Sequence, residues 1–325
     1  MSGEPPLTMT RPNSLKPTQM LALPVIYCPE MVAHTESFSP SAAKPAAVVA
    51  AWARTGIPLD IIEPEPLDDD EISLAHDPQY VAGVFAGKRR NGFGDSDAKL
   101  AASLRFTNGA MFAAARAALD NGNVAVAPCS GFHHAQFDQA AGFCTFNGLM
   151  ITALMLKARG HAQRVGILDF DMHFGDGTEA LIERFGAAGW IEHVTAGESY
   201  HRPGQAREFL HHIPAWIDGM KGCGVLLYQA GADPHVDDPL GGWLTTEQLA
   251  LRDQLVFKHA ARCGVPVAWN LAGGYQRDGD GGIGPVLDIH VNTLKACAET
   301  YLNAGNRESP SCETLLGERT LKVEN

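Results

Sequence analysis

The sequence predicts a single α/β domain built on a mostly parallel central sheet, with helices on both faces of the sheet. Short apolar and β-branched segments alternate with longer segments of helical pattern along the 325 residues, which is typical of strands joined by helical crossovers. Hydrophobic residues make up 45% of the chain, enough for a sizeable core. No repeat or linker interrupts the alternation, so we expect one domain over residues 21–305, between an extension at 1–20 and a polar tail at 306–325.

In the first half of the chain we expect a strand at 22–27, a helix at 40–56, a loop at 64–71, one or two helices at 97–122 and a strand at 124–127. The strands are short apolar, β-branched runs. Gly56 marks the end of the first helix. The segment PEPLDDDE is acidic and interrupted by proline, which favours a loop.

In the second half we expect a helix at 147–160, a strand at 164–170, a helix at 177–186, a strand at 224–231, a helix at 245–264, a strand at 265–274 and a closing helix at 286–305. The segment GVLLYQAG is almost continuously apolar, as a buried strand would be. Thr245 and Gly264 are typical start and stop residues of the helix between them.

The composition excludes several functional classes. The formal net charge of −12 argues against a nucleic-acid-binding protein, which needs a basic surface. No apolar run approaches the roughly 18 residues of a membrane-spanning helix, and the first residues lack the apolar run of a signal peptide. Seven scattered cysteines without a CxxC motif favour a reducing compartment over a disulfide framework. We therefore expect a cytoplasmic protein that binds neither nucleic acid nor membrane.

Polar residues gather where four of the expected strands end. They are His133 and His134 after the strand at 124–127, Asp169, Asp171, His173 and Asp176 at the strand at 164–170, Asp233 after 224–231, and Tyr275 after 265–274. Ligands of open α/β sheets bind beyond the carboxyl ends of the strands. A lone His or Asp there is usually a cap or a loop residue, and we assign Asp237 and Asp238 that role. Four consecutive strand ends together predict an active site.

Three of these residues form the expected metal site. Asp171 and His173 share one face of an extended backbone, and Asp233 follows a neighbouring strand. Catalytic zinc is held by three carboxylate or imidazole ligands and keeps one position open. The sequence therefore predicts zinc at Asp171, His173 and Asp233, although Fe²⁺ or Co²⁺ would also be accommodated.

The remaining polar residues suit the hydrolysis of an amide. Two histidines can divide the work of general base and general acid when carboxylates orient them, and Asp169 and Asp176 are available for that purpose. Tyr275 can donate its hydroxyl to a developing oxyanion. Together with a metal that activates water, His133, His134 and Tyr275 predict metal-assisted amide hydrolysis.

At these residues the chain resembles the histone deacetylase family, which includes bacterial acetylpolyamine amidohydrolases and related amidohydrolases. The motifs GFHHA, GFCTFN, DFDMHFGDGT, GADPHVDDPLGG and AGGY occur in the family's order, and the resemblance covers most of residues 20–305. It implies an arginase-like α/β fold. It also implies the ligand set and the catalytic residues named above, with His133 paired to Asp169, His134 paired to Asp176 and Tyr275 polarising the carbonyl.

The resemblance further implies a substrate tunnel and a second ion. Phe143, which follows Gly142, would line one wall of an acyl-lysine tunnel. A structural potassium ion would be bound by the segment at 169–173, with Ser199 as a further ligand.

Departures from the family concern the substrate rather than the reaction. Phe174 stands where members usually have a second His, and residues 34–45 (HTESFSPSAAKP) replace a motif with an Arg, for which Lys44 is the substitute. The stretch between Asp176 and Asp233 is short. We expect its residues Tyr200 and His201 to face the substrate.

The expected substrate is a small acylated amine of the acetyl-lysine or acetylpolyamine type. The alternative is another small amide, neutral or xenobiotic. A two-manganese ureohydrolase would need a DAHxD motif where this chain has DFDMH, and a non-enzymatic acyl-group binder would have lost Tyr275 or a metal ligand. A homo-oligomer whose second subunit covers the altered rim is compatible with the sequence.

Overall fold

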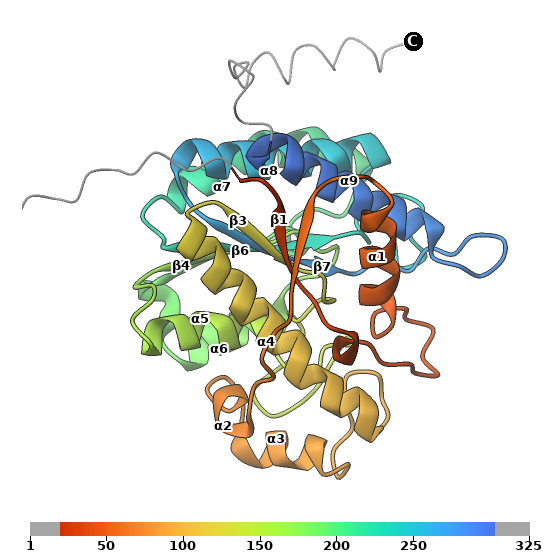
Figure 1. Ribbon diagram of the computed structural model, residues 1–325, viewed down its shortest axis with the longest axis vertical. Coiled ribbons are helices and arrows are strands. Elements are labelled where there is room, and N and C mark those ends of the chain that lie inside the picture. The colour runs from red at the N-terminus through yellow and green to blue at the C-terminus, as the bar shows by residue number, and fades with distance from the viewer. Residues whose placement is uncertain (1–19, 303–325) are drawn as a thin grey trace, which may run out of the picture.

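Seven parallel strands form the centre of the part of the chain that the structure describes. The structure, a computed structural model, describes residues 20–302, so the predicted tail at 306–325 and all but the last residue of the predicted extension lie outside the described residues. The sheet order is β2-β1-β3-β7-β6-β4-β5, and every neighbouring pair is parallel (Figure 1). The bounds are Leu23–Ile26 (β1), Leu59–Ile62 (β2), Val124–Ala127 (β3), Val165–Asp169 (β4), Ile191–Thr195 (β5), Val225–Gly231 (β6) and Val267–Ala272 (β7). The predicted parallel α/β sheet is confirmed.

Helices cover both faces of this sheet, as predicted. One face carries α1 (Lys44–Ala53), α7 (Ala206–Gly219), α8 (Thr246–Cys263) and α9 (Gly284–Tyr301). The other carries α2 (Asp69–Ile72), α3 (Pro78–Phe85), α4 (Ala98–Asn121), α5 (Gly148–Ala158) and α6 (Asp176–Arg184), and Figure 1 shows the two groups on opposite sides. Strand side chains alternate between the faces, so Val126 packs in one core and Ala125 in the other. None of the helices within residues 20–302 is both long and apolar enough to cross a bilayer.

Several elements were not expected from the sequence. The strands β2 and β5 lie at the two edges of the sheet, where β2 is largely exposed, so neither has the apolar run of a buried strand. The helix α7 contains Pro214, which weakens the helical pattern. The helix α3 was also missed, although Asp77 caps it by accepting the N–H groups of Gln79 and Tyr80.

The expected loop at 64–71 is wrong over its last residues, where α2 begins. The side chain of Asp68 accepts the N–H of Glu71 at 2.8 Å, and the Glu71 side chain accepts the N–H of Asp68 at 3.0 Å. This reciprocal capping box stabilises a helical turn. The prolines that suggested a loop, Pro64 and Pro66, lie before the cap and do not oppose it.

Strand order explains where the site forms. The four strands whose ends carry polar residues, β3, β7, β6 and β4, are neighbours in the middle of the sheet. Because all of them run parallel, their carboxyl ends meet at one edge, and the loops that follow them converge there.

Candidate active site

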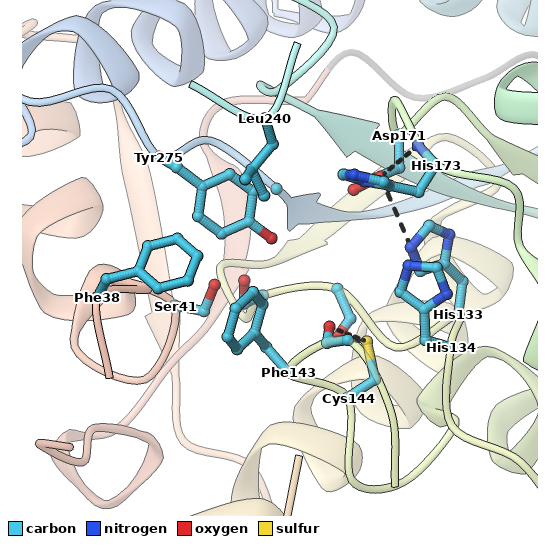
Figure 2. Close-up of a pocket in the computed structure, with 14 residues that line it drawn as sticks. Phe38, Ser41, His133, His134, Phe143, Cys144, Asp171, His173, Leu240 and Tyr275 are labelled. Atoms are coloured by element: carbon cyan, nitrogen blue, oxygen red, sulfur yellow. Dashed lines mark hydrogen bonds and ion pairs between the residues drawn. The ribbon is translucent and has the colours of Figure 1, made fainter. Parts of the chain in front are cut away.

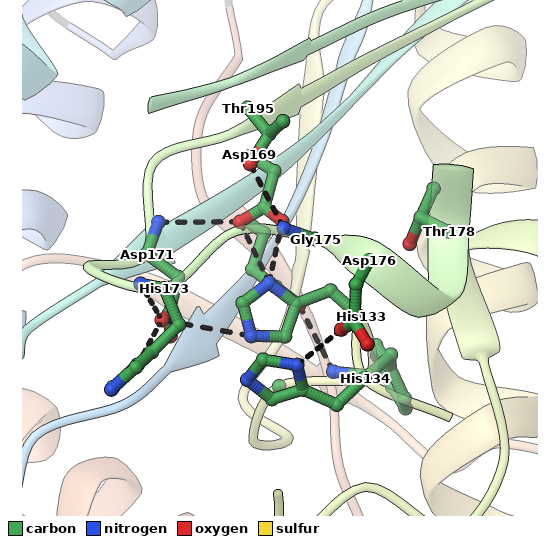
Figure 3. Close-up of polar contacts among 12 residues, drawn as sticks. His133, His134, Asp169, Asp171, His173, Gly175, Asp176, Thr178 and Thr195 are labelled. Atoms are coloured by element: carbon green, nitrogen blue, oxygen red, sulfur yellow. Dashed lines mark hydrogen bonds and ion pairs between the residues drawn. The ribbon is translucent and has the colours of Figure 1, made fainter. Parts of the chain in front are cut away.

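Two histidine–carboxylate pairs lie side by side at this edge (Figure 3). In the loop after β3, the His133 Nδ1–H donates to Asp169 Oδ2 at 2.6 Å, and the His134 Nδ1–H donates to Asp176 Oδ1 at 2.6 Å. The two rings are 4.1 Å apart between centroids. The opposite ring nitrogen of His133, Nε2, lies 3.6 Å from Asp171 Oδ1. The structure thus places each histidine with the carboxylate to which the family resemblance paired it.

Gln229 joins the first pair to the neighbouring strand, and sequence reasoning missed it. Its Nε2 donates to Asp169 Oδ1 at 2.8 Å, and its Oε1 accepts the N–H of Phe132 at 3.0 Å. The residue therefore fixes both the carboxylate and the loop that carries His133. Its signal was present in the sequence, since Gln229 is the one amide side chain in the apolar strand β6.

The predicted metal ligands form a buried cluster next to the histidines. Asp171, His173 and Asp233 each offer an atom within 4.8 Å of the other two. His173 Nδ1 lies 3.0 Å from Asp171 Oδ1 and 3.1 Å from Asp233 Oδ2. Ligand atoms that share one tetrahedral zinc at its usual bond lengths lie roughly 3.3–3.6 Å apart, so these separations are close to those of a zinc site.

One oxygen of the cluster supports this assignment. Within residues 20–302 the buried Oδ2 of Asp233 accepts no hydrogen bond, although it lies 3.1 Å from His173 Nδ1. A buried carboxylate oxygen without a partner is costly unless a cation compensates it. The three residues present therefore fit a divalent metal ion.

A second group of metal-binding residue types lies between α7 and α8. Asp218, His259 and Cys263 are close enough to share an ion. However, Lys221 Nζ lies 2.7 Å from Asp218 Oδ1, and Arg262 lies 2.7 Å from His259 Nδ1. Two cations already occupy this group, so we place the metal in the first cluster.

The pKa values of the ionisable groups in the site are shifted in different directions. Burial lowers the pKa of His133, but Asp169 and Asp171 raise it more, to about 9. The pKa of His134 is lowered, first by burial and then by the neighbouring charge of His133. Opposite shifts on adjacent groups are typical of acid–base pairs. Burial and then Asp233 raise the pKa of Tyr275 well above its usual value, so its hydroxyl stays protonated and can donate.

The loop after β7 positions Tyr275. Its N–H donates to Asp238 Oδ2 at 2.8 Å, while Oδ1 of the same carboxylate accepts the N–H of Leu240 at 3.0 Å. The sequence suggested only a loop role for Asp238. In the structure its carboxylate is buried and fixes the backbone of Tyr275. Asp237 is exposed, as a loop residue would be.

Two buried cationic side chains, those of Lys44 and Arg252, hydrogen-bond to backbone carbonyls next to the site. Lys44 Nζ donates to the carbonyl of Gly273, and burial lowers the pKa of Lys44 to about 8. Arg252 Nη1 donates to the carbonyls of Phe170, at 3.2 Å, and Gly231, at 2.7 Å. Phe170 directly follows β4 and Gly231 is the last residue of β6, so Arg252 fixes the backbone that leads to Asp171 and Asp233. Sequence reasoning missed Arg252.

A cavity of about 320 Å³ connects these groups (Figure 2). The histidines and the metal cluster form one side, and aromatic rings form the other. Its lining comprises Phe38, Ser41, Ser130, Gly131, His133, His134, Gly142, Phe143, Cys144, Asp171, His173, Leu240, Gly273 and Tyr275. Gly142 and Phe143 lie in the wall, where the resemblance placed them. Phe143 has a left-handed backbone, with φ 64°, which is rare for a bulky residue and typical of functional sites.

The expectation for Tyr200 and His201 is wrong. Neither lines the cavity. Tyr200 is buried against Trp243, with ring centroids 5.6 Å apart, and its hydroxyl lies 2.8 Å from His212 Nδ1. His201 is exposed. Burial of the Tyr200 ring in the aromatic core is favourable, so the segment before α7 folds with this ring inside rather than toward the cavity.

The comparisons with known proteins agree with this geometry. Residues 40–203, about half of the chain, match the histone deacetylase domain. The chain belongs to the histone deacetylase family. It is therefore a hydrolase of the deacetylase and amidohydrolase type, acting on amide bonds.

Relatives in this family match most of the chain. An uncharacterized protein of Picosynechococcus is 29% identical over 244 residues, which are 68% of this chain and 80% of the relative. A probable deacetylase of Methanothermobacter thermautotrophicus is 26% identical over 77% of this chain and 85% of its own. The crystal structure of an acetylpolyamine aminohydrolase from Burkholderia pseudomallei has a TM-score of 0.66 at 18% identity, covering 85% of this chain and 99% of that one. This structural likeness confirms the predicted arginase and deacetylase fold.

Proposed function

We propose that this protein is a zinc-dependent amidohydrolase that cleaves the acyl-amide bond of a small acylated amine. The observation that carries the proposal is the arrangement around one cavity. The buried cluster of Asp171, His173 and Asp233, the imidazoles of the histidine pair and the ring of Tyr275 all line it or lie beneath it.

Each part of the site has a role in this reaction. Zinc held by the three ligands would supply a Lewis acid for the carbonyl and would lower the pKa of water. His133 and His134 divide proton removal from the attacking water and proton donation to the leaving nitrogen. Their hydrogen bonds to Asp169 and Asp176 fix the orientation of both imidazole rings, so this orientation is set before the substrate binds.

Tyr275 stabilises the charge that develops on the carbonyl oxygen. Its ring lies opposite the histidines, and its hydroxyl points into the cavity (Figure 2). The raised pKa keeps the proton on that hydroxyl, so it can donate to an oxyanion. Asp238 and Lys44 hold the backbone on either side of the tyrosine's loop.

Two substrate classes fit the reaction. Acylated amines of the acetyl-lysine or acetylpolyamine type are the first. Neutral small amides are the second, and the aromatic and aliphatic side chains at the cavity mouth favour them. The potassium ion near residues 169–173 and Ser199 stays a prediction from the family resemblance.

The test is turnover of a small amide panel by zinc-loaded protein. The panel contains an acetyl-lysine peptide, acetylated putrescine and spermidine, and several neutral N-alkyl and N-aryl amides, each with and without chelator. We expect hydrolysis that stops when chelator is added and returns with zinc. Zinc-loaded protein that hydrolyses no amide, or whose turnover ignores chelator, would contradict the proposal.

A further inference from the structure

Phe38 lies at the mouth of the cavity with 60% of its surface exposed. Its ring stands edge-on to Phe143, with centroids 5.3 Å apart, and lies 5.9 Å from the ring of Tyr275. The rings of Phe143 and Tyr275 are themselves 5.7 Å apart. Figure 2 shows the three rings grouped on the side opposite the metal cluster. They form a continuous aromatic wall from the mouth to the catalytic tyrosine.

The exposed position of Phe38 is held by specific contacts. Arg277 Nη2 donates to the Phe38 carbonyl at 2.9 Å, and Arg277 Nη1 donates to the carbonyl of Gly281 at 3.0 Å. The next residues along the chain, Ser39 and Pro40, are buried. The backbone of Phe38 is therefore anchored at its carbonyl and by the buried residues that follow it, although its ring is left uncovered. An anchored but uncovered apolar ring at a site indicates a binding surface.

The charges around the mouth indicate what this surface binds. Asp171 is the one carboxylate among the described lining residues, and it belongs to the metal cluster. Glu36 and Asp237, exposed carboxylates of the flanking segments, do not line the cavity. A distal ammonium group on a substrate would therefore meet no carboxylate of the cavity lining outside the metal cluster.

We propose that Phe38 selects the substrate by forming an apolar wall for the group on the nitrogen side of the amide, and that the preferred substrates are neutral amides with an apolar nitrogen substituent. The inference rests on the proposed function, which places the carbonyl at the metal cluster. The substituent then lies against Phe38, Phe143 and the half-exposed Leu240. Apolar contact favours a hydrocarbon group there, whereas a charged group would lose hydration without gaining a partner.

The test compares two amides of equal size. N-pentylacetamide and N-acetylputrescine have the same chain length beyond the amide nitrogen, and they differ in a terminal methyl against a terminal ammonium. With zinc-loaded parent protein we expect kcat/KM to be at least about tenfold higher for N-pentylacetamide. Phe38→Ala should raise KM for N-pentylacetamide by about tenfold, and Phe38→Glu should shift the preference toward N-acetylputrescine. Phe185→Ala, which truncates an exposed phenyl ring away from the cavity, is the control and should match the parent.

A binding measurement separates this inference from the proposed function. Tyr275→Phe, which we expect to turn over slowly, is titrated calorimetrically with each amide, alone and combined with Phe38→Ala. If the parent hydrolyses none of the amides of the panel but still binds N-pentylacetamide more tightly in a way that depends on Phe38, the proposed function is contradicted and the role of Phe38 is supported. Equal or tighter binding of N-acetylputrescine, or a preference that survives in Phe38→Ala, overturns the inference.

Discussion

The imidazole ring of His134 occupies the space that a Cβ atom on Gly142 would need. A methyl group at residue 142 would overlap the Cδ2 atom of that ring, and the glycine has a left-handed backbone with φ 51°. Gly142 is therefore in direct contact with the ring of His134, for which we propose a catalytic role. We expect Gly142→Ala to displace His134 and to lower kcat/KM by about 100-fold, the usual scale for a misplaced catalytic group, with the metal retained.

Gly186 provides a matched control for this substitution. It has a similar φ of 58°, and a Cβ atom there would meet nothing within 4 Å. Gly186→Ala should cost about 1–2 kcal/mol of stability from the backbone alone and leave kcat/KM unchanged. Equal activity losses in the two variants would mean that backbone strain, rather than contact with His134, explains the effect.

Removing the hydroxyl of Tyr275 should abolish most turnover without loss of metal. The loop is held through the backbone by Asp238, so Tyr275→Phe keeps the ring in place. We expect kcat to fall by about 10²–10³-fold, as when one oxyanion donor is lost, with unchanged zinc stoichiometry and melting temperature. Near-parental turnover in this variant would remove the tyrosine from the mechanism.

The proposed zinc ligands can be tested by measuring the metal content of purified variants. Asp171→Ala and Asp233→Ala each remove one of the three proposed ligands, and we expect both purified variants to hold far less zinc than the parent by elemental analysis. Asp237→Ala is the matched control, because it removes an exposed carboxylate from the loop that also carries Asp233. Parental zinc stoichiometry in both ligand variants would show that the ion binds elsewhere.

The buried His76 should make stability depend on pH. Its Nδ1–H donates to the Gln136 carbonyl and its Nε2 accepts the N–H of Asn147, each at 2.8 Å. Burial lowers the pKa of His76 from 6.5 to about 4. Between these values only the unfolded chain takes up a proton, so the free energy of unfolding falls as the pH falls. From about pH 7.5 to about pH 5 this group should remove about 2 kcal/mol.

Urea unfolding of the parent and of His76→Gln at both pH values isolates this effect from that of other histidines. Gln has no titrating group, so the stability advantage of the parent over the variant should shrink by about 2 kcal/mol at the lower pH. An advantage of the same size at both pH values would show that His76 does not titrate in this window.

Sequence reasoning reached the centre of the site because its residues follow directly from strand ends. Asp171 and Asp233 come shortly after the ends of β4 and β6, His133 lies in the loop after β3, and the parallel strands bring these residues to one edge. Residues that arrive by tertiary packing could not be located in the same way. Phe38 reaches the mouth from the N-terminal segment, and Arg252 reaches the backbone of β4 and β6 from the middle of α8.

Errors in the predicted elements and site have similar physical causes. Tyr200 was assigned to the substrate because it is aromatic and lies in a shortened segment, but an apolar surface was available for its ring in the core. Asp238 was assigned to a loop, and only the fold shows that its carboxylate meets the Tyr275 backbone. The local sequence pattern predicts which residues have reactive or metal-binding side chains, whereas tertiary packing determines which of these side chains are in contact.

The position of β7 in the sheet has a consequence for how the protein is made. It lies between β3 and β6, yet within residues 20–302 it is the last strand to be synthesised, and it precedes the loop of Tyr275. Until β7 inserts, the nascent chain presents two unpaired strand edges in its centre, which are sites of misassembly and aggregation. Such long-range pairing also slows folding. We therefore expect activity to appear abruptly, late in biogenesis, and the chain to depend most on chaperones just before that strand docks.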